Sequence, residues 1–314
     1  MNNAWKDDPR WAYLFVNLAT LLWASNIMLG RALRDQIGPL TLTASRFTIA
    51  SLLFSAFIFK GSGDQTSLDV KMSIKRNWKL LAGMGLTGAF TFPTLLYFAL
   101  KSTLASNASL INGTAPLVTT FIAAMLLDEK ISVYRILCAL ISLIGVALII
   151  SGRSLDNLAS LQIRSGDLIV LFDVLIWGLY STLGRITMRA MPAIVATGLS
   201  TLFALPFLLL SAGLEWFTQP AQISFTLILA ILYIGIFPTF IGFLSWNEGV
   251  KRVGPTRAMA FYNMLPVFGV LLGVLILQEQ ISWLHVFGGL LIILGGVASL
   301  LPNLSEKRIL PKPG

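Results

Sequence analysis

Long apolar runs occur along almost the whole chain, and charged or turn-forming residues separate them. A helix rises about 1.5 Å per residue, so about 20 mostly apolar residues cross the roughly 30 Å hydrocarbon core of a bilayer. The pattern predicts an all-α integral membrane protein with ten transmembrane helices. Their expected positions are residues 11–30, 39–59, 79–99, 104–127, 132–151, 166–189, 193–213, 223–248, 255–278 and 283–301.

The second half of the sequence repeats the first. Residues 112–132 and 263–282 each carry a proline near the start of an apolar run and end in Glu-x-Ile-Ser, and the matching positions lie 150 residues apart. The first helices of the halves also match, because Trp23 corresponds to Trp177 at an offset of 154. The expected domains are a first five-helix repeat at 11–151, a linker at 152–165, a second five-helix repeat at 166–301 and a tail at 302–314.

An odd number of helices in each repeat means that the second repeat crosses the membrane in the opposite direction. Inverted-topology repeats of this kind place substrate sites near the bilayer midplane and support alternating access, so the duplication indicates transport. By our count, 17 basic residues flank the helix ends on the side of the N-terminus and 5 flank the opposite ends, while Arg46 lies inside a helix. Because cytoplasmic loops are rich in lysine and arginine, both termini are expected to be cytoplasmic.

Composition agrees with a membrane protein and argues against several other classes. Hydrophobic residues make up 56% of the chain, charged residues make up 12%, and the mean hydropathy is +0.79. The net charge of +9 comes from basic residues between apolar runs, so no nucleic-acid partner is expected. One cysteine, Cys138, and one histidine, His285, provide neither an internal disulfide nor a metal cluster. We therefore predict no metal, no cofactor and no catalytic residue, and the sequence has no Gly-x4-Gly-Lys-Ser/Thr loop for ATP hydrolysis.

Aromatic and polar residues share a helix face at membrane depth in the first helix of each half. Positions three and four apart lie on one face of a helix, which groups Trp23 with Asn26 and groups Asp173 with Trp177 and Tyr180. An ionisable group at this depth nearly always faces the bundle interior or water. The two faces are therefore predicted to line a central cavity.

Two charged residues within the predicted helices are candidates for substrate recognition. Asp173 could bind a substrate amine or a proton, or it could pair with Arg46 or be solvated at the interface. Arg46 would cost roughly 2.5–3.5 kcal/mol at the bilayer centre, and snorkelling to an interface would avoid that cost. We expect Arg46 to line the cavity and to bind a substrate carboxylate.

Further aromatic rings are expected around the cavity. Tryptophan and tyrosine concentrate at membrane interfaces, which is our assignment for the tryptophans near predicted helix ends. The deeper rings are expected to wall the cavity instead. They are Trp23, Trp177, Trp246, Tyr97, Tyr180 and Tyr262.

Two positions precede prolines that interrupt apolar runs. Asn112 and Tyr262 each lie four residues before such a proline, which removes the helical partner of their backbone carbonyl group. Irregular backbone in a membrane is tolerated only where protein or a water-filled cavity satisfies it, so a binding site and a simple kink both remain open. Glu129 and Glu279 end the same two runs, and stabilising the turn between helices is preferred to a mechanistic role.

The paired units A-P-x11-D-E-K-I-S and L-P-x11-Q-E-Q-I-S, with W-A-S-N at residues 23–26, resemble the EamA-type repeats of the drug/metabolite transporter superfamily over residues 12–301. The resemblance implies two inverted five-helix halves, a cavity between helices 1–4 and 6–9, peripheral helices 5 and 10, and export of metabolites or amino acids. Among bacterial members, the chain is most similar to the YddG-type amino-acid exporters. One departure is Gly-Leu-Tyr at 178–180 opposite Ala-Ser-Asn at 24–26, which implies a chemically asymmetric cavity.

Together these features predict a multi-pass transporter of the bacterial inner (plasma) membrane. We expect it to export small amphipathic metabolites, with neutral or aromatic amino acids preferred. Its expected partners are a small-molecule substrate, the lipid bilayer and protons or another ion gradient. Export of hydrophobic cations or drugs is the alternative, favoured if Asp173 faces the cavity without a basic partner. A membrane sensor or scaffold is a third interpretation, and it would lack a solvent-accessible central cavity.

Overall fold

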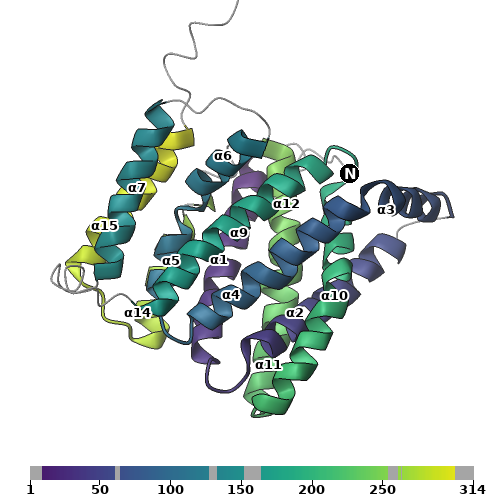
Figure 1. Cartoon of the computed structure of the whole chain (residues 1–314), viewed down its shortest axis with the longest axis horizontal. Coiled ribbons are helices and arrows are strands. Elements are labelled where there is room, and N and C mark those ends of the chain that lie inside the picture. The colour runs from purple at the N-terminus through teal and green to yellow at the C-terminus, as the bar shows by residue number, and fades with distance from the viewer. Residues whose placement is uncertain are drawn as a thin grey trace, which may run out of the picture.

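A computed structural model describes residues 9–60, 64–126, 133–151, 164–253, 261–262 and 264–300, and within these ranges the regular secondary structure is helical. Figure 1 shows the arrangement of the helices. The first half contains α1 (Pro9–Ala32), α2 (Pro39–Lys60), α3 (Asp64–Met84), the π-helix η2 (Gly85–Thr91), α4 (Phe92–Ala99), α5 (Ala105–Asn112), α6 (Ala115–Leu126) and α7 (Val133–Ser151). The second half contains α9 (Ser165–Thr187), α10 (Ala193–Thr218), α11 (Phe225–Ile234), the π-helix η3 (Gly235–Ile241), α12 (Gly242–Val253), α14 (Met264–Leu277) and α15 (Trp283–Leu300).

Seven helical segments of the described residues are long and apolar enough to cross a membrane, and three shorter apolar helices accompany them. Each of these segments overlaps one of the ten regions that the sequence predicts to be helical. The described part of the chain is therefore all-helical and has the helices expected of a multi-pass membrane protein. The number of helices that cross the membrane stays a prediction.

Several regions differ from the sequence-based expectation, and two of these differences change how the first half is built. The polar stretch expected to connect the second and third helices is helical from Asp64, and Asn77 (φ −120°, ψ 15°) kinks α3 before its apolar part. The helix expected at 104–127 is divided into α5 and α6 by a turn at Gly113 and Thr114. Pro116 lies in the first turn of α6, where its missing N–H costs no helical hydrogen bond, so the proline ends one helix and begins another.

Local structure repeats in the two halves at the offset of the sequence duplication. The π-helix η2 begins at Gly85 and η3 begins 150 residues later at Gly235, and each contains seven residues. A π-helix forms i→i+5 hydrogen bonds, is rare, and occurs often at functional sites. A rare element at matching positions supports the duplication more strongly than matching α-helices would.

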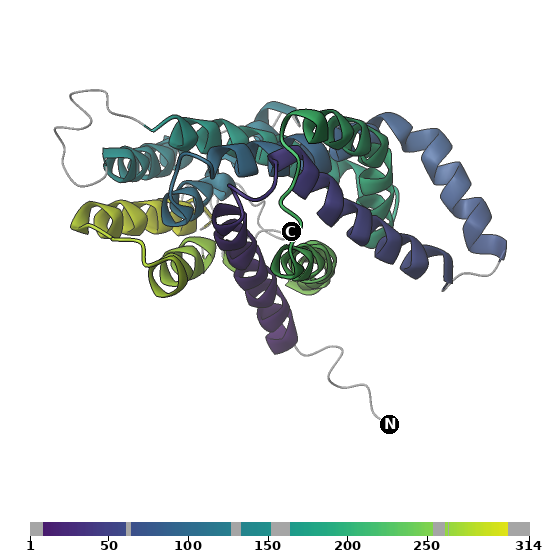
Figure 2. The same ribbon diagram turned by 90° about the horizontal axis from the view of Figure 1, so that it is seen from below.

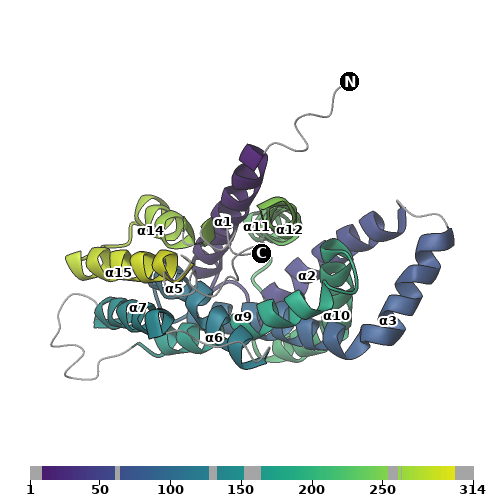
Figure 3. The same cartoon turned by 90° about the horizontal axis from the view of Figure 1, so that it is seen from above.

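The ribbon views show how the halves are arranged. Helices α7 and α15 lie side by side at one edge of the bundle in all three views, away from α2 and α3 (Figures 1, 2 and 3). Between these edges, helices of different halves pack in pairs: α2 with α10, α1 with α12, α5 with α14 and α6 with α9. Contacts between the halves therefore form the centre of the molecule.

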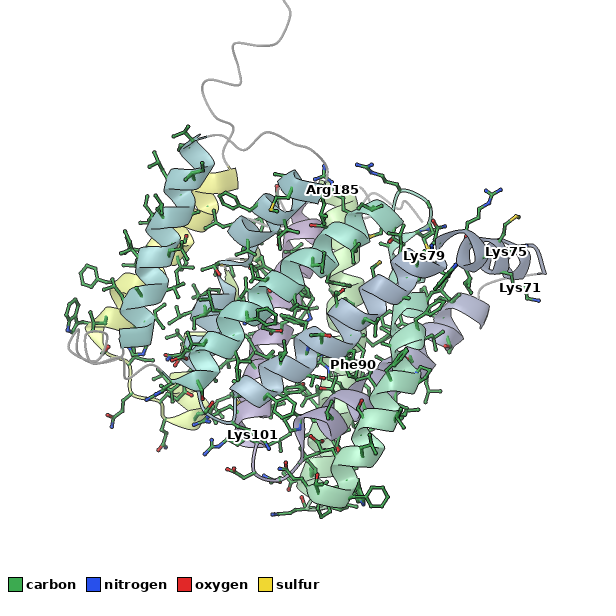
Figure 4. All side chains as sticks on the ribbon, viewed as in Figure 1. Lys71, Lys75, Lys79, Phe90, Lys101 and Arg185 are labelled. Carbon is green, nitrogen blue, oxygen red and sulfur yellow. The ribbon has the colours of Figure 1, made fainter. Side chains whose placement is uncertain are left out.

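Charged side chains mark the two ends of the bundle. Lys71, Lys75 and Lys79 of α3 and Arg185 of α9 lie toward one end, whereas Lys101 lies at the other (Figure 4). By the positive-inside rule, the end with α3 is expected to be cytoplasmic. We call the other end, where α2 and α5 begin, the distal end.

A glycine contact holds the peripheral pair together. A Cβ atom on Gly288 of α15 would meet the carbonyl oxygen of Gly145 in α7, and a Cβ atom on Gly145 would meet the carbonyl oxygen of Gly288. Small residues let membrane helices approach closely enough for van der Waals packing to stabilise them. The two glycines therefore set the distance between α7 and α15.

The substitution Gly288→Ala is expected to lower the apparent melting temperature of the detergent-solubilised protein, because its methyl group would displace backbone rather than a flexible side chain. Overpacking of this kind costs about 1–3 kcal/mol. Gly213→Ala in α10 is the matched control, since a Cβ atom there has no neighbour within 4 Å. Equal melting temperatures for the two variants, measured by fluorescence-detected size exclusion after heating, would contradict the packing argument.

Candidate functional site

A small cavity lies at the junction of the two halves. Its volume is about 40 Å³, enough for a few water molecules but too small for an amino acid. Both halves contribute side chains, so the cavity occupies the position expected for the substrate site of a duplicated transporter. The lining residues are Trp23, Asn26, Ile27, Arg46, Phe47, Gly88, Phe92, Pro93, Leu96, Asn112, Trp177, Phe243, Tyr262 and Leu265.

Arg46 forms the polar end of the cavity. Its side chain is 4% exposed, so it does not snorkel to an interface. Nε donates to the hydroxyl of Thr239 at 2.9 Å, and Nη1 donates to Asn26 Oδ1 at 3.0 Å and to the hydroxyl of Tyr97 at 2.7 Å. Tyr97 also donates to Asn26 Oδ1 at 2.6 Å. These neutral partners hold the guanidinium group, and its described hydrogen bonds leave Nη2 available.

The π-helix η3 presents two of the groups that build this end. Its i→i+5 geometry is visible at Thr239, whose hydroxyl donates to the carbonyl oxygen of Ile234 at 2.7 Å and accepts from Arg46. The carbonyl oxygen of Pro238 accepts from Nε1 of Trp23 at 3.0 Å. Local widening of the helix thus fixes both the arginine and the first tryptophan.

Aromatic rings form the rest of the wall. The Trp23 ring lies between those of Trp177, Phe243 and Trp246, with ring centroids 5.9, 5.7 and 5.4 Å away. Tyr262 completes the cluster, since its ring is 6.0 Å from the Trp177 ring at an interplanar angle of 23°. Offset aromatic pairs at these distances are favourable beyond simple burial. The cavity therefore has an aromatic body and one cationic end.

Asp173 lies outside the lining of this cavity. It is fully buried, and neither carboxylate oxygen has a hydrogen-bond partner. The alternatives of pairing with Arg46 and of interfacial solvation are therefore both wrong, because Arg46 is bound elsewhere and Asp173 has no exposed surface. An unpartnered buried carboxyl group is costly, which makes a functional role the better explanation.

The structure brings most of the predicted site residues together, and their role in binding stays a prediction. Six of the ten line the cavity: Trp23, Asn26, Arg46, Asn112, Trp177 and Tyr262. The hydroxyl of Tyr97 accepts from Arg46, the ring of Trp246 lies 5.4 Å from that of Trp23, and the ring of Tyr180 lies 5.2 Å from that of Trp177.

Asn112 occupies the break between α5 and α6. It is the last residue of α5, and its side-chain Nδ2 donates to the carbonyl oxygen of Ala108 at 3.0 Å. Its Oδ1 is buried without a partner, so this acceptor remains for a ligand or a water molecule. The chain thus breaks its helix at this position, and a role of Asn112 in binding stays a prediction. The matching segment next to Tyr262 includes Asn263, which lies outside the described residues.

Several contributors were not identified from the sequence. Phe92 and Phe243 are apolar residues in apolar helices, so nothing in the pattern distinguishes them from lipid-facing positions. Thr239 had a signal, because Phe-Pro-Thr occurs once in each half, at residues 92–94 and 237–239. Within the described ranges, no group of three or more His, Cys, Asp or Glu side chains could hold a metal ion.

Two carboxylates bind helix N-termini at the distal end. Glu215, at the end of α10, accepts from the backbone N–H groups of Leu40 and Thr41 at 3.2 and 2.7 Å and from the Thr41 hydroxyl at 2.8 Å. Glu279 accepts from the N–H groups of Ala105 and Ser106 at 2.8 and 3.0 Å and from the Ser106 hydroxyl at 2.6 Å. Each carboxylate thus caps the N-terminus of a helix in the other half.

These caps revise one expectation and add a residue. Glu279 was expected to hold the turn that follows its own helix, but its carboxylate binds α5 of the first half. Glu129 lies outside the described residues, so the same expectation is not tested there. The role of Glu215 had no signal in the sequence. Its neighbour Gly38 leaves the required space, since a Cβ atom there would collide with the Glu215 carboxylate.

Comparison with known proteins identifies the family. The model of the EamA-like transporter family matches residues 10–151 and 164–301. The chain belongs to the EamA-like transporter family. It is therefore a membrane transporter, for which a small-molecule substrate is implied.

Relatives support the same assignment. The chain is 27% identical to the uncharacterized transporter YyaM of Bacillus subtilis, covering 82% of this chain and 83% of that one. It is 28% identical to a probable terminal-alkyne amino-acid exporter of Streptantibioticus cattleyicolor, covering 95% and 96%. A solved crystal structure shares the fold with a TM-score of 0.63 at 23% identity, covering 95% of this chain and 98% of the other.

The Arg46 hydrogen bonds generate a structural prediction. Asn26→Leu removes the acceptor shared by Arg46 and Tyr97, so it is expected to destabilise the fold by about 1–3 kcal/mol. Asn26→Asp keeps the shape and supplies a charged acceptor, so it is expected to retain the melting temperature of the parent protein or raise it. Thermal unfolding in detergent measures both, and an Asp variant as unstable as the Leu variant would contradict the assigned contacts.

Proposed function

We propose that this transporter exports small amphipathic metabolites that carry a carboxylate, with neutral and aromatic amino acids as the first class to test. The observation that carries the proposal is Arg46. Its guanidinium group is buried beside the cavity, and its partners in the described structure are two hydroxyl groups and an amide oxygen. A guanidinium group binds a carboxylate in a bidentate geometry, and a buried charge without a counter-ion favours an anionic ligand.

The remainder of the cavity suits the rest of such a molecule. The ring cluster around Trp23 and Trp177 offers an apolar wall to an aliphatic or aromatic side chain. Asn112 Oδ1 provides an acceptor in the same lining for a substrate ammonium group. A ligand with a carboxylate, an amine and an apolar side chain would therefore use all three features.

Alternating access accounts for the size of the cavity. In this conformation the cavity is much smaller than an amino acid, and carboxylates of the second half bind helix N-termini of the first half at the distal end. The substrate would enter after the halves move apart at the other end.

The proposal includes ten helices in two inverted five-helix repeats, at 11–151 and 166–301 around the linker 152–165, with both termini cytoplasmic in a bacterial inner membrane. The matching π-helices and the placement of basic residues support it.

One relative supports the substrate class. The Streptantibioticus cattleyicolor protein is described as a probable terminal-alkyne amino-acid exporter, and it aligns over nearly the whole of this chain. Its substrate would also combine the amino-acid group with an apolar side chain. Coupling to protons or to another ion gradient completes the proposal.

Proteoliposomes test the substrate class directly. Vesicles containing the protein and loaded with labelled amino acids are expected to release phenylalanine, leucine or a related neutral amino acid faster than protein-free vesicles. Asn26→Asp should slow this release at least tenfold, because the new carboxylate occupies Arg46 while the fold is retained. Release of phenethylamine, which lacks the carboxylate, should change less. Release no faster than from protein-free vesicles across a broad amino-acid panel would overturn the assignment.

Export of hydrophobic cations is the second candidate, and Asp173 is the observation that favours it. Its carboxyl group is buried with no hydrogen-bond partner, so it lacks a basic partner, but it lies outside the lining of the cavity and therefore meets only half of the condition stated for this candidate. In that case Asp173→Asn should abolish efflux of a lipophilic cation such as tetraphenylphosphonium while sparing zwitterionic substrates. Unchanged cation efflux in this variant, or no cation efflux in the parent protein, would exclude the second candidate.

A further inference from the structure

Helix α3 starts before the chain enters the hydrocarbon of the membrane. It continues through η2 into α4, and the stretch of these helices that is long and apolar enough to cross a membrane, Lys71–Ala99, has 29 residues. At about 1.5 Å per residue this stretch is about 44 Å long, whereas the hydrocarbon core is about 30 Å thick, so about nine residues exceed it. Charged residues occur at 71–79 and not at 80–99, so the excess lies at the start. We call residues 71–79 the basic segment.

The basic segment is bent relative to the rest of the span. Asn77 (φ −120°, ψ 15°) kinks α3 within the segment, and the start of α3 extends beyond the neighbouring helices (Figures 1 and 3). On the inner side of the segment, Ile74 packs against the apolar cluster that contains Ile58 and Met191. A helix longer than the hydrocarbon is thick adapts by tilting or kinking. The kink therefore lets the segment follow the headgroup layer instead of continuing straight into water.

The outer side of the basic segment carries four positive charges. Lys71, Lys75 and Lys79 are spaced four residues apart and so share one face of the helix, and Arg76 adjoins them. All four side chains are exposed. Among the described residues, none of the four lies within ion-pair distance of a carboxylate. The face therefore has four cationic groups that the protein itself does not neutralise.

Two apolar side chains lie beside these charges. Met72 is 52% exposed and Trp78 is 51% exposed, and the Lys79 ammonium group lies 5.8 Å from the centre of the Trp78 ring. Tryptophan concentrates at the boundary between headgroups and acyl chains. A helix that lies in a membrane interface combines basic and apolar side chains in this way.

We propose that the basic segment is a binding surface for anionic phospholipids. The phosphate groups of the lipids bind the three lysines and Arg76, while Met72 and Trp78 contact the glycerol groups and the upper acyl chains. Basic residues next to a membrane are attracted to an anionic leaflet, and their contributions accumulate with each added charge. The bound lipids would supply the counter-ions that the described protein lacks at this face.

The depth of the segment favours lipid over other acidic partners. A nucleic acid or an acidic protein would also be attracted to four basic groups, but it would have to reach them within the headgroup layer, because the apolar stretch begins directly after Lys79. Neither partner would have a use for the exposed side chain of Met72. A phospholipid offers a phosphate and an acyl chain at the depths where the segment places basic and apolar groups.

The second repeat lacks this surface. At the 150-residue offset that relates η2 to η3, the four basic positions of α3 correspond to Ala221, Phe225, Thr226 and Leu229. Helix α11 begins only at Phe225, so it has no counterpart of the extension that starts α3. The surface therefore belongs to one end of the bundle. Its assignment to the cytoplasmic leaflet rests on the proposed function, whereas the binding of anionic lipid does not.

Native mass spectrometry of the detergent-solubilised protein tests the lipid chemistry. The parent protein is expected to retain more dioleoyl phosphatidylglycerol than dioleoyl phosphatidylcholine, because these lipids have the same chains and differ in charge. Lys75→Gln should lower the affinity for phosphatidylglycerol at least twofold. Arg189→Gln is the matched control, since it removes an exposed positive charge just after α9, at the same end of the bundle but outside the segment, and it should have a smaller effect. Equal retention of the two lipids by the parent protein, or equal losses in the two variants, would overturn the proposal.

Electron paramagnetic resonance tests the contact with the membrane. A spin label at Met72→Cys, in a protein that also carries Cys138→Ala, is expected to collide more often with oxygen dissolved in the bilayer than with a water-soluble nickel chelate in phosphatidylglycerol nanodiscs. Replacing the three lysines by glutamine should reverse this ratio, and replacing them by arginine, which keeps the charge, should preserve it. A label that the nickel chelate reaches more readily in the parent protein would overturn the proposal. Neither measurement involves a transport substrate, so both results stand whether or not amino acids are exported.

Discussion

A guanidinium group within the bilayer is the constraint on which the centre of this structure depends. Leaving an arginine unsatisfied at that depth would cost several kcal/mol, so every segment near Arg46 must supply an acceptor or leave room for one. Three segments do so: α1 through Asn26, α4 through Tyr97 and η3 through Thr239. Because η3 belongs to the second half, the arginine of α2 ties the two halves together at the place where the cavity forms.

The π-helix η3 explains how a buried helix can offer hydrogen-bonding groups to Arg46 and Trp23. In a bilayer, each backbone polar group needs a protein partner, and ordinary α-helices use theirs internally except at the helix ends. The wider turn of η3 leaves the Pro238 carbonyl to accept from Trp23 and positions the Thr239 hydroxyl for Arg46. The irregular backbone therefore lies next to the cavity, and the neighbouring α-helices keep their regular backbone hydrogen bonds.

The sequence predicted the helical regions well because run length is a direct consequence of bilayer thickness. It also located Arg46, Asn26 and Trp23, since polar residues and repeated tryptophans in apolar runs are conspicuous. The residues that it missed depend on tertiary structure. Glu215 resembles any glutamate at a helix end, and only the packing of α10 against α2 brings it to Thr41. The division of 104–127 into two helices was missed because proline is compatible with both a kink and a helix start.

The carboxylate caps at the distal end form contacts whose net free energy is small enough for them to be broken and formed again. Each replaces the hydration of a carboxylate and of a helix N-terminus by charge-assisted hydrogen bonds, with a net gain of about 1.5–3 kcal/mol for each bond to a charged group. If the helices separate at this end, water can solvate both the carboxylate and the helix N-terminus. Hydration then compensates for most of the free energy of the lost hydrogen bonds. In the proposed alternating access, Glu215 and Glu279 would therefore stabilise the present conformation without making it permanent. Alternating access requires two conformations of similar free energy. Polar contacts that water can replace, such as these carboxylate caps, keep the difference in free energy between them small.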